Sequence, residues 1–224
     1  MTKTTLYPSA LLLALVAGGA SAAQPRRVSF ATADDGVIGA DLYEGGEHAV
    51  VLAHGAVFDK ESWSEQAAAL LAQGHTVLAI DFRGYGESRG GSAGEDLSVD
   101  VLGALAYLRE QGARWVSVVG GSMGARASAL ASQQVEIGEI QKLILLAPPP
   151  FAHAETLEAG EILFLVSKGD GLRSSVEAQF EAAPEPKRLV VLPGSAHAQH
   201  IFKTKRGGEL MEIIIAFLAD GPNG

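Results

Sequence analysis

Ser122 lies in the stretch Gly120-Gly121-Ser122-Met123-Gly124, between an apolar run and an alanine-rich run. A small polar residue among glycines suits three kinds of site: a phosphate cradle, a tight structural turn, or the seat of a nucleophile. The Gly-x-Ser-x-Gly spacing alone does not choose among them, because chance matches occur in a chain with 27 glycines. The surrounding sequence has to decide.

Nucleotide-binding patterns do not fit this stretch. A dinucleotide site needs Gly-x-Gly-x-x-Gly, and Ser122 stands where the second glycine must be. A P-loop needs Gly-Lys followed by Ser or Thr, which this stretch lacks. A nucleophile in a sharp strand-to-helix turn needs glycine at positions 120 and 124, where side chains would collide with neighbouring backbone. The pattern therefore favours a nucleophilic Ser122 in a strained turn, beside a helix N-terminus that stabilises negative charge.

A serine hydroxyl attacks a carbonyl only when a base takes its proton and a carboxylate orients that base. Around a turn of this kind the carboxylate and the histidine follow the serine in that order along the chain. Asp170 and His197 supply this order, each in a loop after a predicted strand. His200 is a second candidate for the base. The i, i+3 spacing of the two histidines would also suit a metal, but no third ligand is evident, so we expect neither a metal nor a cofactor.

The elements that must position these residues alternate along the chain. A hairpin is predicted over residues 28–46, around the turn signal Asp35-Gly36. Apolar runs typical of strands buried on both faces follow, at 48–56, 75–82, 115–120, 142–150, 161–171 and 188–197. Helices are predicted over 60–74, after a possible cap at Asp96, and over 209–219.

Alternating strands and helices predict an α/β fold with a largely parallel central sheet, an N-terminal antiparallel hairpin and helices on both faces. In such folds ligands bind beyond the carboxyl ends of the strands. The polar residues that follow or end the predicted strands are His54, Asp81, Ser122, Asp170 and His197. The sequence therefore predicts one reactive site at this edge of the sheet.

The chain resembles the α/β-hydrolase superfamily, in particular its cap-less serine esterases and dienelactone-hydrolase-like members. Five stretches carry the resemblance, in the order and approximate spacing of that superfamily: LAHGA (52–56), DFRGYGES (81–88), GGSMGA (120–125), VSKGDG (166–171) and LPGSAHAQHIF (192–202). They extend over nearly all of residues 23–224, which we expect to form a single domain. The resemblance implies an oxyanion hole made by the backbone N–H groups of Ala56 and Met123.

The resemblance also ranks the candidate bases. The family's histidine follows the last strand in a Gly-x-x-His setting, which fits Gly194 to His197 better than His200. His54 is expected to be structural and to hold the loop that carries Ala56. The remaining histidines are expected on the surface or in loops; they are His48, His75 and His153.

Among the acids, Asp170 is favoured over Asp81. In the family Asp81 would belong to an Asp-x-Arg-Gly-x-Gly loop, where it would bind backbone amides and Arg83. Glu155 or Glu158 would serve only if the acid followed the preceding strand, a known variation in the superfamily. Directly after that strand the chain reads Pro-Pro-Pro-Phe, without an acid.

Many relatives insert a lid between the strand that ends here near Leu146 and the strand that starts near Ile162. This gap is only about fifteen residues, so we expect no lid domain and an open site walled by short loops. The apolar candidates for its lining, each of which ordinary core packing would also explain, are Val57, Phe58, Met123, Phe151 and Ile201.

The amino terminus predicts export. Lys3 precedes an apolar run too short to span a bilayer comfortably, and Ala20-Ser21-Ala22 is a small-x-small cleavage signature. Residues 1–22 are therefore expected to be a signal peptide for a periplasmic or secreted protein, with an uncleaved membrane anchor as the alternative. The chain has no cysteine, which excludes disulfides, thiolate metal sites and a cysteine nucleophile.

The composition limits the classes of partner that the protein is expected to bind. The formal net charge of −9 argues against nucleic acid and anionic membrane surfaces. The expected partner is a small-molecule ester or acyl substrate, and nothing in the sequence requires more than a monomer. Taken together, the expected activity is hydrolysis of carboxylic esters by a Ser-His-Asp triad through an acyl-enzyme. Thioester, amide or peptide substrates and a non-catalytic binding protein remain alternatives.

Overall fold

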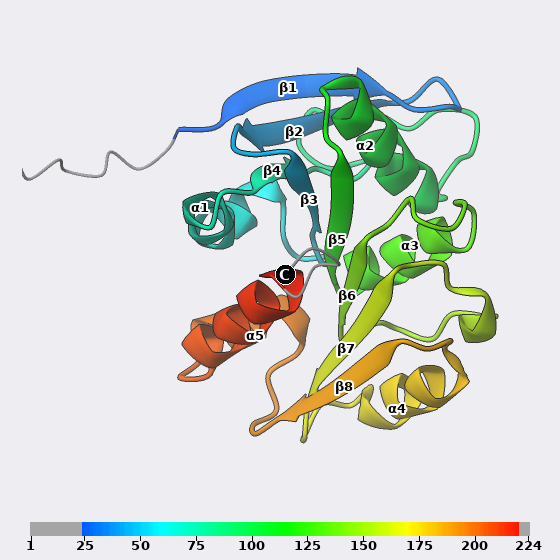
Figure 1. The fold of residues 1–224 in the computed structure, drawn as a ribbon. Coiled ribbons are helices and arrows are strands. Elements are labelled where there is room, and N and C mark those ends of the chain that lie inside the picture. The colour runs from blue at the N-terminus through cyan, green and yellow to red at the C-terminus, as the bar shows by residue number, and fades with distance from the viewer. Residues whose placement is uncertain (1–23, 220–224) are drawn as a thin grey trace, which may run out of the picture.

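Eight strands form one sheet in the order β1-β2-β4-β3-β5-β6-β7-β8 in the computed structural model, which describes residues 24–219 (Figure 1). The strands are β1 (Arg26–Ala31), β2 (Val37–Tyr43), β3 (His48–Ala53), β4 (Thr76–Ile80), β5 (Trp115–Gly121), β6 (Lys142–Leu146), β7 (Glu161–Ser167) and β8 (Lys187–Leu192). β2 runs antiparallel to both β1 and β4, and every other pairing is parallel. The predicted mostly parallel sheet with an N-terminal antiparallel hairpin is confirmed. The predicted signal peptide lies outside the described residues.

Helices cover both faces of this sheet. The α-helices are α1 (Ser64–Ala72), α2 (Ser98–Glu110), α3 (Met123–Ser132), α4 (Arg173–Ala182) and α5 (Gly207–Ala219). Short 3₁₀ helices are η1 (Lys60–Trp63), η2 (Ala154–Thr156) and η3 (Ala198–Lys203). α1 and α5 lie on one face, and α2, α3 and α4 lie on the other (Figure 1). Among the described residues, no helix has both the length and the apolar character needed to cross a membrane.

Helix α4 is absent from the sequence-based expectation. Its only large apolar residues are Val176 and Phe180, so its helical period is weak, and the helix forms because Val176 packs into the core. Helix α1 ends as expected: its last residue is Ala72, and Gly74 takes a φ of +88° just beyond it.

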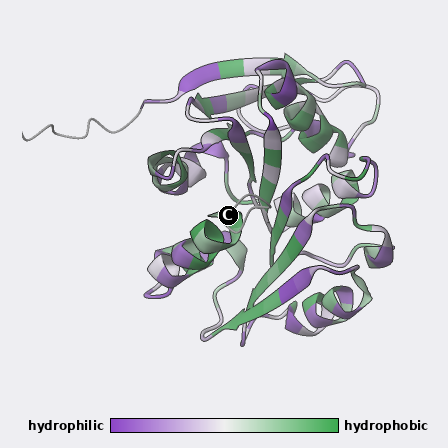
Figure 2. Ribbon diagram, in the orientation of Figure 1, coloured by the Kyte–Doolittle hydropathy of each residue, from purple (hydrophilic) through white to green (hydrophobic). Residues whose placement is uncertain are grey.

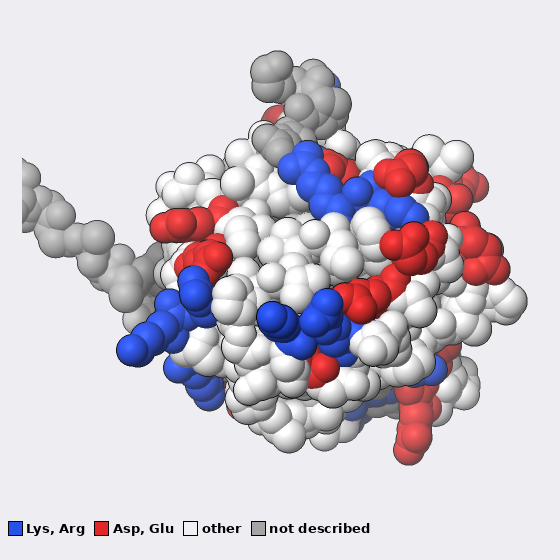
Figure 3. All heavy atoms as spheres, turned by 90° about the horizontal axis from the view of Figure 1, so that it is seen from below, with Lys and Arg blue, Asp and Glu red and all other residues white. Residues whose placement is uncertain are grey.

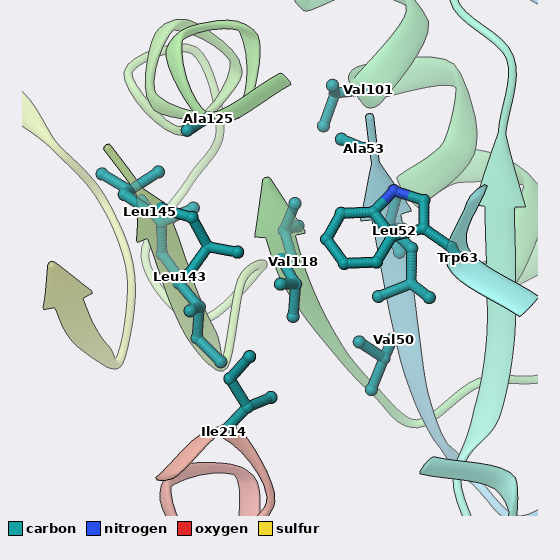
Figure 4. Packing of buried hydrophobic residues seen from close by; sticks show 14 of the residues in the cluster. Val50, Leu52, Ala53, Trp63, Val101, Val118, Ala125, Leu143, Leu145 and Ile214 are labelled. Atoms are coloured by element: carbon teal, nitrogen blue, oxygen red, sulfur yellow. The ribbon is translucent and has the colours of Figure 1, made fainter. Parts of the chain in front are cut away.

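The core lies on both sides of the central strands, whose residues are buried almost throughout. Figure 2 shows these strands as largely hydrophobic, while the outer helices alternate between hydrophobic and hydrophilic residues. Successive strand residues point to opposite faces, so the sheet needs two apolar layers. In Figure 4, Ile214 of α5 points toward Val118 and Leu143 on one face, and Val101 of α2 lies beside Ala53 on the other.

A buried ion cluster fixes the loop after β4. Arg83 pairs with Asp34 at 2.9 Å and with Asp100 at 2.6 Å, and the three side chains are at most 9% exposed. The expected pairing of Arg83 with Asp81 is therefore wrong. Asp81 instead accepts a hydrogen bond from the backbone N–H of Lys60 and pairs with its ammonium group. The cluster ties the β1–β2 turn, the loop after β4 and α2 together.

Two of the histidines expected on the surface or in loops are largely buried near the amino ends of strands: His75 lies in the loop just before β4, as expected, whereas His48 is the first residue of β3. The His48 and His75 rings lie edge to face at 4.7 Å, and His75 is only 9% exposed. His48 Nε2 lies 2.8 Å from the hydroxyl of Ser117, which is fully buried in β5. The two rings meet because Ala49 of β3 and Thr76 of β4 are register partners, and each histidine comes one residue before its partner residue.

Charged side chains are mixed on the face formed by β8 and α4. Figure 3, which views the molecule from that side, shows basic and acidic groups interspersed rather than gathered into a patch of one sign. Such a face offers no continuous basic surface to a polyanion.

Candidate active site

Ser122 occupies a strained turn between β5 and α3. Its φ of 49° and ψ of −112° lie outside the regions that ordinary residues prefer. Its backbone N–H donates to the carbonyl of Leu146 at 2.8 Å, which holds the turn against β6. A Cβ at Gly120 would come within 2.6 Å of the Ala125 backbone, and one at Gly124 would overlap the Ala53 carbonyl. The glycines expected around Ser122 are thus sterically required.

The side chains of Ser122, His197 and Asp170 form one hydrogen-bonded chain. His197 Nε2 lies 2.8 Å from Ser122 Oγ, and His197 Nδ1 lies 2.8 Å from Asp170 Oδ2. The Asp170 side chain is 3% exposed, whereas that of His197 is 36% exposed. A carboxylate at Nδ1 places the proton on that nitrogen and leaves Nε2 free to accept one from the serine.

The loops that carry Asp170 and His197 are fastened to each other. Asp170 follows β7, and its second carboxylate oxygen accepts the backbone N–H of Leu172 at 2.9 Å. The hydroxyl of Ser167 donates to the carbonyl of Ala196 at 2.6 Å. Gly169 N–H also donates to the Gly194 carbonyl at 2.8 Å. The separation between the carboxylate and the imidazole is therefore set by bonds between the two loops.

The loop after β3 carries Ala56 in a turn closed by the Phe58 N–H, which donates to the Gly55 carbonyl at 3.0 Å. His54, which is fully buried, donates from Nδ1 to the same carbonyl and accepts the Phe82 N–H at Nε2. Burial lowers the pKa of His54, in keeping with a neutral ring that can accept this bond. His54 therefore holds the loop that carries Ala56.

Ala56 and Met123 are brought together by Tyr85. The Tyr85 hydroxyl donates to the Ala56 carbonyl at 2.9 Å and lies 3.7 Å from the Met123 sulfur. Met123 opens α3, and the first N–H groups of a helix have no partner within it. The Met123 amide, directly after Ser122, therefore has no partner within α3, and Ala56 lines the same cavity as Ser122.

Gln199 is a site residue that the sequence interpretation missed. It is 4% exposed, its Oε1 accepts the Gly55 N–H at 2.6 Å, and its Nε2 donates to Ser62 Oγ at 3.1 Å. It joins η3, which begins after His197, to the turn that carries Ala56. A glutamine between two histidines carries no catalytic pattern, and no local signal marks its partner, 144 positions away.

A cavity of about 190 Å³ adjoins Ser122 and His197. Val57 and Phe58, two of the expected lining residues, lie on its wall. Ile201 does not fit that expectation, because it is 2% exposed and packs in the hydrophobic core. Phe151 is half-buried against the core and is not among the residues that form this wall.

The competing candidates do not take part in the hydrogen-bonded chain. His200 is exposed and lines the same cavity as Ser122, with its ring 4.9 Å from that of Phe58. Asp81 is engaged with Lys60, and Glu155 pairs with exposed His153 at 3.2 Å. Within residues 24–219, no group of three or more His, Asp or Glu side chains is arranged to hold a metal ion.

Comparison with protein families identifies the family to which the chain belongs. The model for the alpha/beta hydrolase fold matches residues 48–177, more than half of the 224-residue chain. The chain belongs to the α/β-hydrolase family. The segment between β6 and β7, where many relatives carry a lid, contains only η2. The family's open sheet is thus present without an inserted domain at this position.

Curated relatives match over part of their length. An uncharacterised protein of Mycobacterium tuberculosis is 29% identical over 176 residues, which cover 66% of this chain and 62% of that protein. A non-heme chloroperoxidase of Streptomyces lividans is 28% identical over 60% of this chain and 45% of its own. The chain therefore spans less than two thirds of the length of these relatives.

Solved structures agree on the fold. An esterase of Pyrococcus furiosus superimposes with a TM-score of 0.75 at 19% identity, over 88% of this chain and 93% of its own. A dienelactone hydrolase of Anabaena variabilis gives a TM-score of 0.73 at 18% identity, over 88% and 99%. At these identities the likeness concerns the architecture.

Proposed function

We propose that the protein is a cofactor-free serine hydrolase that cleaves carboxylic esters through an acyl-enzyme. The observation that carries the proposal is the continuous hydrogen-bonded chain from Ser122 through His197 to Asp170 beside an open cavity. Ser122 attacks the acyl carbonyl, His197 takes its proton and returns it to the leaving alcohol, and Asp170 holds the imidazole in the required tautomer.

The amides of Ala56 and Met123 stabilise the oxyanion of the tetrahedral intermediate. Preorganised donors matter because they point at the developing charge without reorganisation, and each is worth about 3 kcal/mol of barrier in a protease example. Water then attacks the acyl-enzyme, with His197 acting as base again. The short loops leave the site open to water, which this second step requires.

The family and the named esterase and dienelactone hydrolase support a hydrolase in general terms. The ester is chosen over an amide or peptide bond because an alcohol is a better leaving group than an amine. A thioester, whose thiol leaves at least as readily, is the alternative substrate. We further propose that residues 1–22 direct export to the periplasm or beyond. Mass determination of the mature protein tests that step, since cleavage after Ala22 leaves a chain that begins at Ala23.

An active-site-directed fluorophosphonate tests the reaction class. We expect stoichiometric labelling of the wild-type protein and none of Ser122→Ala. Folded wild-type protein that resists labelling, and hydrolyses no ester, would instead support a binding protein on the same scaffold.

The base is tested separately with two alanine variants. His197→Ala should abolish labelling, while His200→Ala, which removes an exposed ring from the cavity wall and leaves the Ser122–His197 hydrogen bond in place, should label at nearly the wild-type rate. The opposite pattern would assign the base to His200.

A further inference from the structure

Phe58 separates two hollows on the surface beside Ser122. The cavity of about 190 Å³ is bounded by the turn after β3 and by η3, and Ser122 and His197 line it. A second hollow of about 450 Å³ lies between η1, the start of α1 and η3. Phe58 and Gln199 line both hollows. Each therefore forms part of the wall between them.

The Phe58 ring is held in place from the side of η3. The His200 ring lies 4.9 Å from it, and the Lys203 ammonium group lies 5.1 Å from its centroid. A cation over an aromatic face adds attraction to this packing. The ring is thus a fixed partition, although Phe58 is only half-buried.

The backbone of Phe58 serves the turn independently of its ring. Its N–H closes the turn that presents Ala56, and any residue except proline supplies that donor. Gln199, by contrast, holds Gly55 directly through its side chain. Of the two shared residues, Phe58 alone can lose its side chain without losing a hydrogen bond to the turn.

We propose that Phe58 sets the size limit of the substrate group that occupies the cavity beside Ser122, and that the natural substrate is an ester whose group there is short. At about 30 Å³ for each water-sized group, a cavity of about 190 Å³ holds about six non-hydrogen atoms. A longer group meets the Phe58 ring and has to turn into solvent. This inference rests on the proposed ester hydrolysis at Ser122.

Two ester series test the limit: nitrophenyl esters from acetyl to decanoyl, and acetate esters of alcohols from methyl to decyl. In the wild-type protein, kcat/KM should rise with chain length up to about six carbons in one series and then level off or fall. In Phe58→Ala the chain can continue into the second hollow and contact Phe202. We expect the ratio of kcat/KM for the decyl-length ester to that for the butyl-length ester to rise about 10-fold or more.

Two further variants control for general loosening of the site. Phe202→Ala makes the same truncation on the wall of the second hollow only, so it should leave the chain-length limit where it is. Phe58→Leu keeps part of the partition and should shift the limit less than Phe58→Ala. Circular dichroism and fluorophosphonate labelling show whether each variant is folded with a reactive serine.

The proposal is overturned if Phe58→Ala labels normally and both series keep the wild-type chain-length profile, or if Phe202→Ala shifts the profile equally. These results would leave ester hydrolysis itself intact. Failure of the proposed function looks different: no ester of any length is hydrolysed, and the wild-type protein does not label.

Discussion

Two serine–histidine hydrogen bonds of equal length lie at opposite ends of β5. At the carboxyl end Ser122 bonds to His197 at 2.8 Å, and near the amino end Ser117 bonds to His48 at 2.8 Å. Ser122 sits in a strained turn beside a cavity, whereas Ser117 is fully buried within the strand. Ring nitrogen Nδ1 of His197 faces the Asp170 carboxylate, whereas the His48 ring packs against that of His75.

The difference shows that a serine–histidine contact is not by itself a nucleophile. Ser117 has a partner but is fully buried, and its histidine packs against His75 and is close enough to Lys142 to be repelled by its charge. Burial, followed by repulsion from these two groups, lowers the pKa of His48 to about 4. His197 is more exposed and has a carboxylate to stabilise the imidazolium that forms in the reaction.

The largest difference in kcat should appear between alanine variants of the two serines. Ser122→Ala should lower kcat for a nitrophenyl ester by about 10⁶-fold, the scale found in a serine protease. Ser117→Ala should leave kcat within a few-fold and cost about 1 kcal/mol of unfolding free energy, the usual worth of one hydrogen bond. Steady-state kinetics and urea unfolding measure both. If Ser117→Ala were fully folded and still lost turnover, the two serines would not differ in role as proposed.

The next largest effect on kcat is expected at Asp170, the carboxylate that orients His197. Asp170→Asn keeps the shape of the side chain but favours the wrong imidazole tautomer, so kcat should fall by about 10⁴-fold. Asp81→Asn, the matched change at a carboxylate bound to Lys60, should lower kcat far less. Equal losses in the two variants would mean that Asp170 acts only through folding.

A smaller effect is expected at Gln199. Gln199→Ala removes the acceptor for Gly55 N–H and loosens the turn that carries Ala56, so kcat should fall by about 10- to 100-fold with little change in KM. Gln199→Glu retains an acceptor at this position and should recover part of the loss. A change confined to stability, with kcat intact, would show that Gln199 does not position the turn for the reaction.

The smallest expected effect is a pH dependence of the unfolding free energy that arises from His48, at the amino end of the sheet. The folded-state pKa of His48 lies below its ordinary value of 6.5, so the unfolded chain binds the proton more tightly. The stability linked to His48 is therefore complete above about pH 6.5 and is lost as the pH falls toward 4, by up to about 1.4 kcal/mol per pH unit. His48→Gln should reduce this slope in urea unfolding.

Exposed His153 provides the control for that measurement. His153→Gln should leave the slope unchanged, because its ring is 74% exposed. If His48→Gln and the wild-type protein lose stability in parallel between pH 6.5 and 4.5, the contribution assigned to His48 is wrong.

The architecture could be predicted from the chain alone, since its apolar runs are long enough to mark the buried strands and the failed nucleotide patterns left a nucleophile turn as the best interpretation of the glycines at 120 and 124. Local order along the chain also placed Asp170 and His197 after neighbouring strands, which meet at one edge of a parallel sheet. Helix α4 escaped because its apolar period is weak, and its burial depends on the sheet beneath it.

The pairing of side chains far apart in the chain depends on the tertiary structure. Arg83 bonds to Asp34 and Asp100, which lie 49 and 17 positions away, rather than to nearby Asp81. Gln199 reaches Gly55 across 144 positions, and Ile201, two residues further on, turns into the core. Such pairings depend on how loops from distant strands pack, and no local preference of the chain records that packing. The wall between the two hollows at Phe58 is set in the same way.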